Sequence, residues 1–326
     1  MAPEIGDALR NIRIGLQALV DVVPATMYAV PVTGEEHGLT RGREITEELF
    51  GTWTRANGVR RRGEHDSFTI NTYLYYDWHV YLLAAVLGMP VTANHAGETA
   101  VKDHTFIEKG SAPLVCIQFD DGIQWWQMLN CRGNSLTYNI PTEAVPTADV
   151  EFLGGTAVPI ATPADLPMSI ADYFHPDWLQ LLLKVNGVAA DVMGGSVAVN
   201  RNLTPRFVGN RQSAPKRFVR GATTVEFDVQ PDYSTDTGSL FKKWRDNDAP
   251  QSVEFEFVSL TDDIGVVPSH PTYSILVPKA GLIEGAHNIG EVPVETPISG
   301  QGIYDATTGG AIEVTLINEI ASVATS

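Results

Sequence analysis

Two short stretches of strictly alternating apolar and acidic residues constrain the fold of this chain more than any other feature. Residues 225–229 read VEFDV and residues 253–257 read VEFEF. Successive side chains of a β-strand point to opposite faces, so each stretch has one apolar face and one face of carboxylates. Both stretches therefore predict half-buried strands. Between them, capping oxygens at 236–239 and a proline-containing stop at 246–250 predict a short helix at 240–245.

The same order of strand, helix and strand is predicted earlier, in residues 66–121. Residues 67–72 alternate, and an apolar run at 78–87 predicts a helix that ends at Gly88 and Pro90. Residues 115–120 then alternate again, after a polar insertion at 91–110. A basic segment precedes each unit. We interpret this weak repetition as an internal duplication.

Length agrees with two units, because 326 residues suit two domains of about 150 residues each. We expect a mainly β fold of two tandem β-sandwich or barrel domains, each with a flanking helix. The first domain, with an N-terminal helix, is expected at residues 1–160. A linker and bridging helix are expected at 161–190, and the second domain at 191–326.

The remaining elements are predicted from apolar periodicity and from turn residues. Helices are expected within 1–23 and at 178–185, a long loop at 33–64, and a basic loop at 201–220. Further strands are expected at 25–32, 124–130, 135–140, 149–153, 196–199, 273–277, 292–298 and 312–317.

The net charge of −17 argues against a general nucleic-acid clamp, because phosphate binding needs a basic face. An acidic surface that only keeps the protein dispersed is the alternative. No apolar run is long enough to span a bilayer and no signal-peptide core is found, so we expect synthesis in the cytosol without export or membrane anchoring. The two cysteines, Cys116 and Cys131, are expected to be reduced thiols, although they could pair across neighbouring strands.

The sequence contains no arrangement that predicts a catalytic, metal or cofactor site. HExxH, CxxC, GxSxG and P-loop spacings are absent, and the eight histidines are scattered. Gly300 and Gly302 resemble the start of a dinucleotide loop, but Asp305 stands where a third glycine is needed. We therefore expect neither an enzyme nor a bound cofactor.

The order of strand, long loop, strand, helix, strand and closing hairpin resembles the tail tube proteins of long-tailed bacteriophages. The resemblance covers residues 25–155 and, more fully, 190–320. It is best at residues 196–200, 217–230, 240–246, 252–259, 275–280 and 312–318.

This resemblance implies a structural virion protein, assembled in the host cytoplasm and located in the tail. Such proteins form rings of six sandwich domains around a channel for DNA, and the rings stack into a tube. Two domains per chain imply rings of three chains with pseudo-sixfold symmetry. The implied partners are further copies of the chain, the tape measure protein, the tail terminator and DNA that passes without specific binding.

Two sets of charged residues are the candidate sites. The carboxylates of Glu226, Asp228, Glu254 and Glu256 are expected to share one polar face that lines the channel, continued in the first domain by Ser67, Thr69, Asn71 and Gln118. The alternative is that these carboxylates face outer solvent. The basic segments are expected to contact a neighbouring subunit or ring through Arg55, Arg60, Arg61, Arg62, Arg206, Arg211, Arg217 and Arg220.

Two other classes of protein are compatible with the predicted fold. A carbohydrate-binding or adhesion β-sandwich needs exposed aromatic side chains in a cleft, whereas the tryptophans here mostly follow strand or helix periods. An enzyme on a β-sandwich needs a catalytic constellation, which the sequence does not contain.

Overall fold

The structure is a computed structural model that describes most of the chain. The described residues are 12–47, 56–108, 110–141, 143–163, 176, 178–208, 215–231, 250–265, 269–285 and 297–323. Within them, only the backbone is described for 40–47, 56–62 and 284–285. The predicted helix at 240–245, most of the predicted strand at 292–298, Arg55 and Arg211 lie outside this part of the chain.

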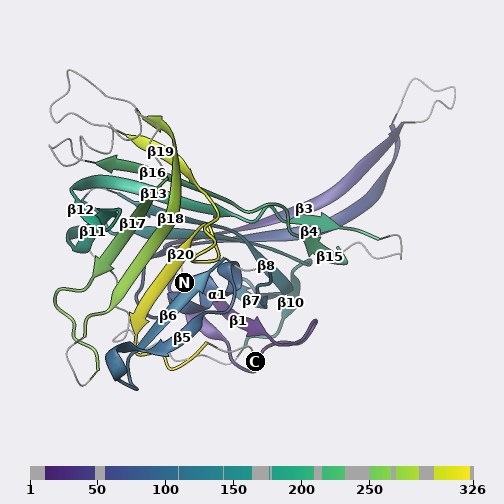
Figure 1. Cartoon of the computed structure of the whole chain (residues 1–326). Coiled ribbons are helices and arrows are strands. Elements are labelled where there is room, and N and C mark those ends of the chain that lie inside the picture. The colour runs from purple at the N-terminus through teal and green to yellow at the C-terminus, as the bar shows by residue number, and fades with distance from the viewer. Residues whose placement is uncertain are drawn as a thin grey trace, which may run out of the picture.

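The fold is mainly β, as predicted, and all its strand pairs are antiparallel (Figure 1). A sheet that we name the long sheet runs from an edge strand, β3, to β19. Its strands, in spatial order, are β3 (Gly34–Glu47), β4 (Ala56–Tyr73), β9 (Thr147–Gly154), β8 (Trp125–Ile140), β13 (Val192–Asn200), β16 (Thr224–Pro231) and β19 (Ile298–Gly302).

A second sheet, the opposing sheet, covers the apolar side of the long sheet. Its strands, in spatial order, are β12 (Val188–Ala190), β11 (Leu181–Val185), β17 (Gln251–Val258), β18 (Thr272–Gly285), β20 (Glu313–Asn318), β6 (Lys102–Ile107) and β5 (Val91–Asn94). Strand β18 belongs to both sheets, because its first half pairs with β17 and β20 and its second half pairs with β19.

The first half of β8 forms part of a third, smaller sheet. Its other strands are β2 (Tyr28–Val30), β1 (Ile12–Gln17), β7 (Leu114–Asp120) and β10 (Val158–Ile160). A separate hairpin is formed by β14 (Thr204–Arg206) and β15 (Arg217–Val219), and two short 3-10 turns lie at η1 (His95–Gly97) and η3 (Trp178–Gln180).

The core lies between the apolar faces of the sheets. The two alternating stretches form β16 and β17, and their Val225, Phe227, Phe255 and Phe257 side chains are buried, as predicted. Phe255 crosses the core to β13, where a Cβ atom on Gly195 would lie only 3.0 Å from its ring. The apolar faces of β16 and β17 therefore face each other from different sheets.

Helix α1 (His79–Leu87) is enclosed by this core and packs against β8, β6 and β1. Of its nine residues only Tyr81 is not buried, which fits a helix that is apolar on all sides. It approaches β8 closely at Gly133, where a Cβ atom would lie 2.7 Å from Val86 Cγ2 and 2.9 Å from the Ala85 carbonyl oxygen. The predicted helix at 78–87 is thus confirmed, and its surroundings require glycine at one contact.

Three elements differ in type from the prediction. Residues 12–17 of the predicted N-terminal helix form β1, which is buried along its whole length between β2 and β7. Residues 178–185 form η3 and β11 instead of a bridging helix, because Leu183 and its neighbours pair with β17. The predicted loop at 33–64 is instead the long β3–β4 hairpin, whose outer part projects from the body (Figure 1).

Smaller differences concern the bounds of strands. The polar insertion at 91–110 contains β5 and β6, and the strands predicted at 124–130 and 135–140 are one bent strand, β8. Residues 158–160, at the end of the predicted first domain, form β10, and the basic loop contains the β14–β15 hairpin.

Strands from the two halves of the chain pair directly with each other. Strand β8 pairs with β13 through residues such as Leu136 and Val199, and β20 pairs with β6. Buried residues of both halves also form one connected apolar cluster. The division into domains at 1–160 and 191–326 stays a prediction, and these pairings are the contacts through which two such units would be joined.

A buried polar chain in the core makes a prediction about acid sensitivity. His79 Nδ1 lies 3.4 Å from the Tyr273 hydroxyl, which lies 3.0 Å from the Tyr138 hydroxyl. Desolvation of the ring lowers the pKa of His79 to about 3. Between that pKa and the unfolded value of about 6.5, the unfolded chain binds the extra proton, so the free energy of unfolding falls as the pH falls.

We expect His79→Leu to remove this dependence. Between pH 7 and pH 5 the free energy of unfolding of the unsubstituted protein should fall by about 2 kcal/mol more than that of the variant. Urea unfolding at the two pH values measures the difference. Val80→Ala, at an equally buried position without a titratable group, should keep the original dependence. Equal pH dependence in the His79→Leu variant would contradict the assignment.

Candidate functional site: the polar face of the long sheet

Three rows of side chains cross the outer face of the long sheet, which we name the polar face. Directly paired residues of antiparallel strands lie on the same face, so the strand register defines each row. The rows are Glu36, Thr69, Glu151, Ser135, Asn200 and Thr224; Gly34, Asn71, Asp149, Thr137, Ala198, Glu226 and Gln301; and Tyr73, Thr147, Asn139, Ser196, Asp228 and Ser299.

The middle row crosses all seven strands, a width of about 29 Å at the usual strand spacing. The three rows contain five carboxylates, Glu36, Asp149, Glu151, Glu226 and Asp228, and neither lysine nor arginine. Arg132 of β8 lies outside them, beyond the register shift at Gly133 and Ser135. The polar face is therefore broad, acidic and free of basic side chains within these rows.

Two of these carboxylates are bound by amides of neighbouring strands. Asp149 accepts hydrogen bonds from Asn71 Nδ2 at 2.6 Å and from Asn139 Nδ2 at 2.9 Å. Glu151 accepts one from Asn134 Nδ2 at 2.5 Å. Amide donors hold these carboxylates in place without neutralising them, so the face keeps their negative charge.

Glu226 and Asp228 instead face a shallow groove of about 360 Å³ over β13, β16 and β19. Ser196, Ser299 and Gln301 also line it. Glu226 is exposed, whereas partial burial raises the pKa of Asp228. Together with the exposed Glu36, these two carboxylates are open to solvent or to a ligand.

Glu254 and Glu256 lie on the outer face of the opposing sheet. The expectation that they share one polar face with Glu226 and Asp228 is wrong, because β16 and β17 lie on opposite sides of the core, although they are connected through β19 and β18. They also have a basic partner, since Lys184 Nζ of β11 lies 2.6 Å from Glu256 Oε2 and 3.9 Å from Glu254 Oε2. The sequence analysis does not predict this ion pair, because it places Lys184 in a helix instead of in strand β11.

In the first half of the chain, Ser67, Thr69 and Asn71 point to the same side of β4, and Thr69 and Asn71 lie within the rows of the polar face. Gln118 does not share this side. It is buried in the small sheet, where its Nε2 atom donates a hydrogen bond of 2.8 Å to Gln127 Oε1.

The two basic segments lie next to each other. Arg60, Arg61 and Arg62 are in the outer half of β4, and the exposed Arg206 and Arg217 are paired in the β14–β15 hairpin. The hairpin contacts β4 through aromatic side chains, because the His65 ring lies 6.4 Å from the Phe207 ring and 6.3 Å from the Phe218 ring. Most of the predicted basic contact residues therefore lie in two adjacent hairpins, β3–β4 and β14–β15, which we together name the basic projection.

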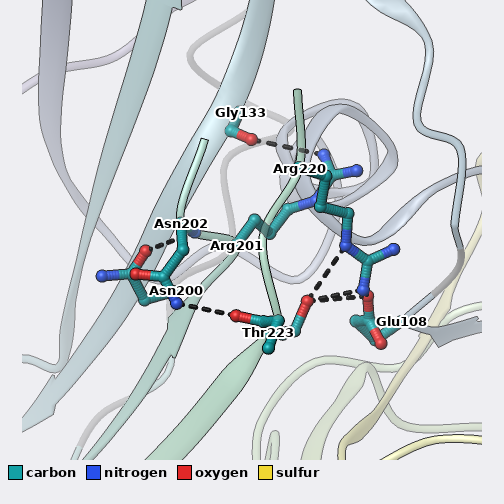
Figure 2. A network of polar contacts seen from close by, with 8 residues as sticks. Glu108, Gly133, Asn200, Arg201, Asn202, Arg220 and Thr223 are labelled. Atoms are coloured by element: carbon teal, nitrogen blue, oxygen red, sulfur yellow. Dashed lines mark hydrogen bonds and ion pairs between the residues drawn. The ribbon is translucent and has the colours of Figure 1, made fainter. Parts of the chain in front are cut away.

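Polar contacts fix both ends of the β14–β15 hairpin to the body (Figure 2). After β15, Arg220 forms an ion pair with Glu108 and donates from Nε to Thr223 Oγ1 at 3.1 Å. Before β14, the buried Arg201 donates from a guanidinium nitrogen to the Gly133 carbonyl at 3.2 Å. Burial lowers the pKa of Arg201, with a smaller contribution from Arg132. Arg220 thus forms its ion pair within its own chain, whereas Arg206 and Arg217 are exposed.

Sequence reasoning missed Glu36, Asp149 and Glu151 as members of the polar face. The signal for two of them was present, because residues 149–152 read DVEF and alternate like the two stretches that were recognised. Glu36 gave no such signal, since it was assigned to a loop.

Within the described residues, no helix is long and apolar enough to cross a membrane. The same part of the chain contains no group of three or more His, Cys, Asp or Glu residues placed to hold a metal ion.

The fold and the polar face define a β-sheet structural protein with one extended acidic face and one basic projection. The family model described as Phage tail tube protein matches residues 11–314, so the chain belongs to the phage tail tube protein family. Comparison with curated proteins gave no match. Members of this family are structural components of the virion tail that assemble into a tube with other tail proteins.

On the polar face, Asp149 is held by two hydrogen bonds, whereas Glu226 is exposed, so the two carboxylates should contribute differently to stability. We expect Asp149→Asn to lower the free energy of unfolding by about 1–3 kcal/mol, because two amide donors lose a charged acceptor. Glu226→Gln should change it by less than about 0.5 kcal/mol, since Glu226 is exposed. Urea unfolding of both variants measures this, and equal effects would contradict the distinction.

Proposed function

We propose that the chain is the major tail tube protein of a bacteriophage and that its polar face lines the channel through which DNA passes. The observation that carries this proposal is the composition of the three rows, with five carboxylates and no basic side chain across seven strands. Repulsion between carboxylates and phosphates acts over about 8–10 Å in physiological salt. A channel wall of this kind keeps DNA from adhering during passage.

Both halves of the chain contribute to this surface. Strands β3, β4, β9 and β8 come from the first half, and β13, β16 and β19 come from the second. One chain therefore supplies two neighbouring segments of wall, which fits rings of three chains with pseudo-sixfold symmetry. In such a ring the outer edge of β3, which has no strand partner among the described residues, is covered by the next chain.

Glu254 and Glu256 are placed away from the channel in this arrangement. Their sheet forms the other side of the subunit, and Lys184 partly compensates their charge. The channel-facing set is therefore Glu226 and Asp228 together with Glu36, Asp149 and Glu151.

The basic projection supplies contacts between stacked rings in this proposal. Arg55, Arg60, Arg61, Arg62, Arg206, Arg211 and Arg217 dock on acidic surface of a neighbouring copy, whereas Arg220 keeps its partner Glu108 within its own chain. The assembled tube, formed in the host cytoplasm, would also meet the tape measure protein, the tail terminator and the passing DNA.

The number of chains in a ring tests the assembly. Purified protein examined by electron microscopy should form rings or tubes whose cross-section has threefold symmetry, with three chains in each ring. Six chains in a ring would overturn the pseudo-sixfold arrangement, and a monodisperse monomer under all conditions would overturn the tube.

The orientation of the sheets is tested by chemical labelling of cysteine variants. Both natural cysteines are buried, so an introduced cysteine provides the accessible thiol. In tubes of the Glu226→Cys variant, a small maleimide should react, whereas a maleimide carrying a bulky polymer should react at least about tenfold more slowly than in unassembled protein, because the channel excludes it.

Glu256→Cys is the matched control, because it places the thiol on the opposite side of the subunit. Its labelling by the bulky reagent should be slowed less by assembly than that of Glu226→Cys. Unchanged bulky labelling of Glu226→Cys on assembly, in tubes verified by microscopy, would place the polar face outside the channel.

A further inference from the structure

A pocket of about 370 Å³ lies beside the edge strand β3, on the side of that strand away from the polar face. Glu35, His37 and Leu39 of β3 form one wall. The other lining residues are Phe68, Phe119, Asp121 and Trp126. The pocket is therefore open, aromatic and lined by carboxylates, and its lining contains neither lysine nor arginine.

The aromatic walls are fixed in position. The Phe119 ring centroid lies 4.8 Å from that of Phe68 and 5.0 Å from that of His37. Trp126 Nε1 donates a hydrogen bond of 2.6 Å to Asp121 Oδ2, which holds the indole beside the carboxylate. A planar cation entering the pocket would meet aromatic rings and a carboxylate together.

The Asp121 carboxylate is held in its charged form by the local backbone. Asp121 Oδ1 accepts hydrogen bonds from the backbone N–H groups of Gln124 and Ile123. These bonds, the Gln124 one above all, and the Trp126 donor lower the pKa of Asp121.

A further acidic side chain lies behind His37. The buried Asp66 accepts hydrogen bonds through Oδ2 from Ala157 N at 2.7 Å and is 3.1 Å from His37 Nε2. Its other oxygen, Oδ1, has no hydrogen-bond partner among the described residues. Asp66 thus places a second acidic group, with one oxygen left without a hydrogen bond, directly behind the pocket wall.

We propose that this pocket receives an arginine side chain from the β3–β4 hairpin of a second copy of the chain. This inference rests on the proposed tube and names the surface on which its basic projection docks. A guanidinium fits the pocket because it stacks on aromatic faces and pairs with carboxylates at the same time. The outer half of the hairpin carries Arg41, Arg43, Arg60, Arg61 and Arg62.

Arg60 and Arg61 lie too far along the hairpin to enter the pocket of their own chain. Arg60 is paired with Glu44 and Arg61 with Arg43, whereas the pocket begins at Leu39 on the same hairpin. Four or five strand positions separate these levels, or about 14–17 Å along an extended strand. The outer part of the hairpin backbone projects away from the body (Figure 1), so a neighbouring copy is the molecule that it can contact.

Disulfide crosslinking tests the contact. Two double variants, Leu39→Cys/Arg60→Cys and Leu39→Cys/Arg61→Cys, pair a pocket position that is 44% exposed with a hairpin position. A disulfide requires Cα atoms within about 4.4–6.8 Å, so neither pair can close within one chain. Mild oxidation of assembled tubes should give covalent chains of two or more copies on denaturing gels with at least one of the two variants.

The single variants serve as controls and should give no such ladder. Tubes of both double variants that are intact by microscopy but remain uncrosslinked would overturn the pocket inference and leave the tube proposal standing. Failure of the unsubstituted protein to form rings or tubes would instead overturn the proposed function itself.

A charge variant provides an independent measurement. Asp121→Asn keeps the Oδ1 acceptor of the turn but removes the charge in the pocket. We expect the protein concentration needed for tube formation in low salt to rise about tenfold, which is the expected scale for losing a partly desolvated charge contact. Asp120→Asn is the matched control, because Asp120 accepts a hydrogen bond from Gly122 N but does not line the pocket. Equal effects of the two substitutions would contradict the inference.

Discussion

The helix α1 imposes the main physical constraint on this structure, because it has no polar side to turn toward water. Eight of its nine residues are buried, and exposure of such a surface would cost about 25 cal/mol for each Å² of apolar area. Strands β8, β6 and β1, which between them belong to all three sheets, contact the helix, and its buried residues are part of the common apolar core. Strand β8 bends from one sheet into another beside this helix, with Gly133 at the point of closest approach.

The two sheets that enclose this core have unlike outer faces. The long sheet turns an acidic and amide-rich face outward, whereas the opposing sheet carries carboxylates compensated by Lys184. The projecting basic hairpins are fixed to the body by contacts such as the Arg220–Glu108 ion pair (Figure 2). Charges of opposite sign are thus concentrated in different places, which favours a defined orientation when copies associate.

Local periodicity was sufficient to predict the elements with one buried face. Val225, Phe227 and their counterparts in β17 are two residues apart, and that spacing belongs to a strand whatever its neighbours are. The β3–β4 hairpin could not be found in this way, because its projecting part does not cover the core and its sequence does not alternate. In β1, Ile12 and Leu16 fit a helical spacing as well as a strand spacing, so only the pairing with β7 distinguishes them.

The composition of the candidate site could not be predicted from local sequence patterns alone. Which strands share a sheet is decided by pairing between distant segments, and β16 and β17 were separated by that pairing. Strand β18 has a mechanical consequence as well, since one backbone passes from the opposing sheet into the edge of the long sheet. The two layers cannot shear past each other without stretching that strand. An assembly of such subunits therefore bends at the joints between copies, while the shape of each copy is preserved.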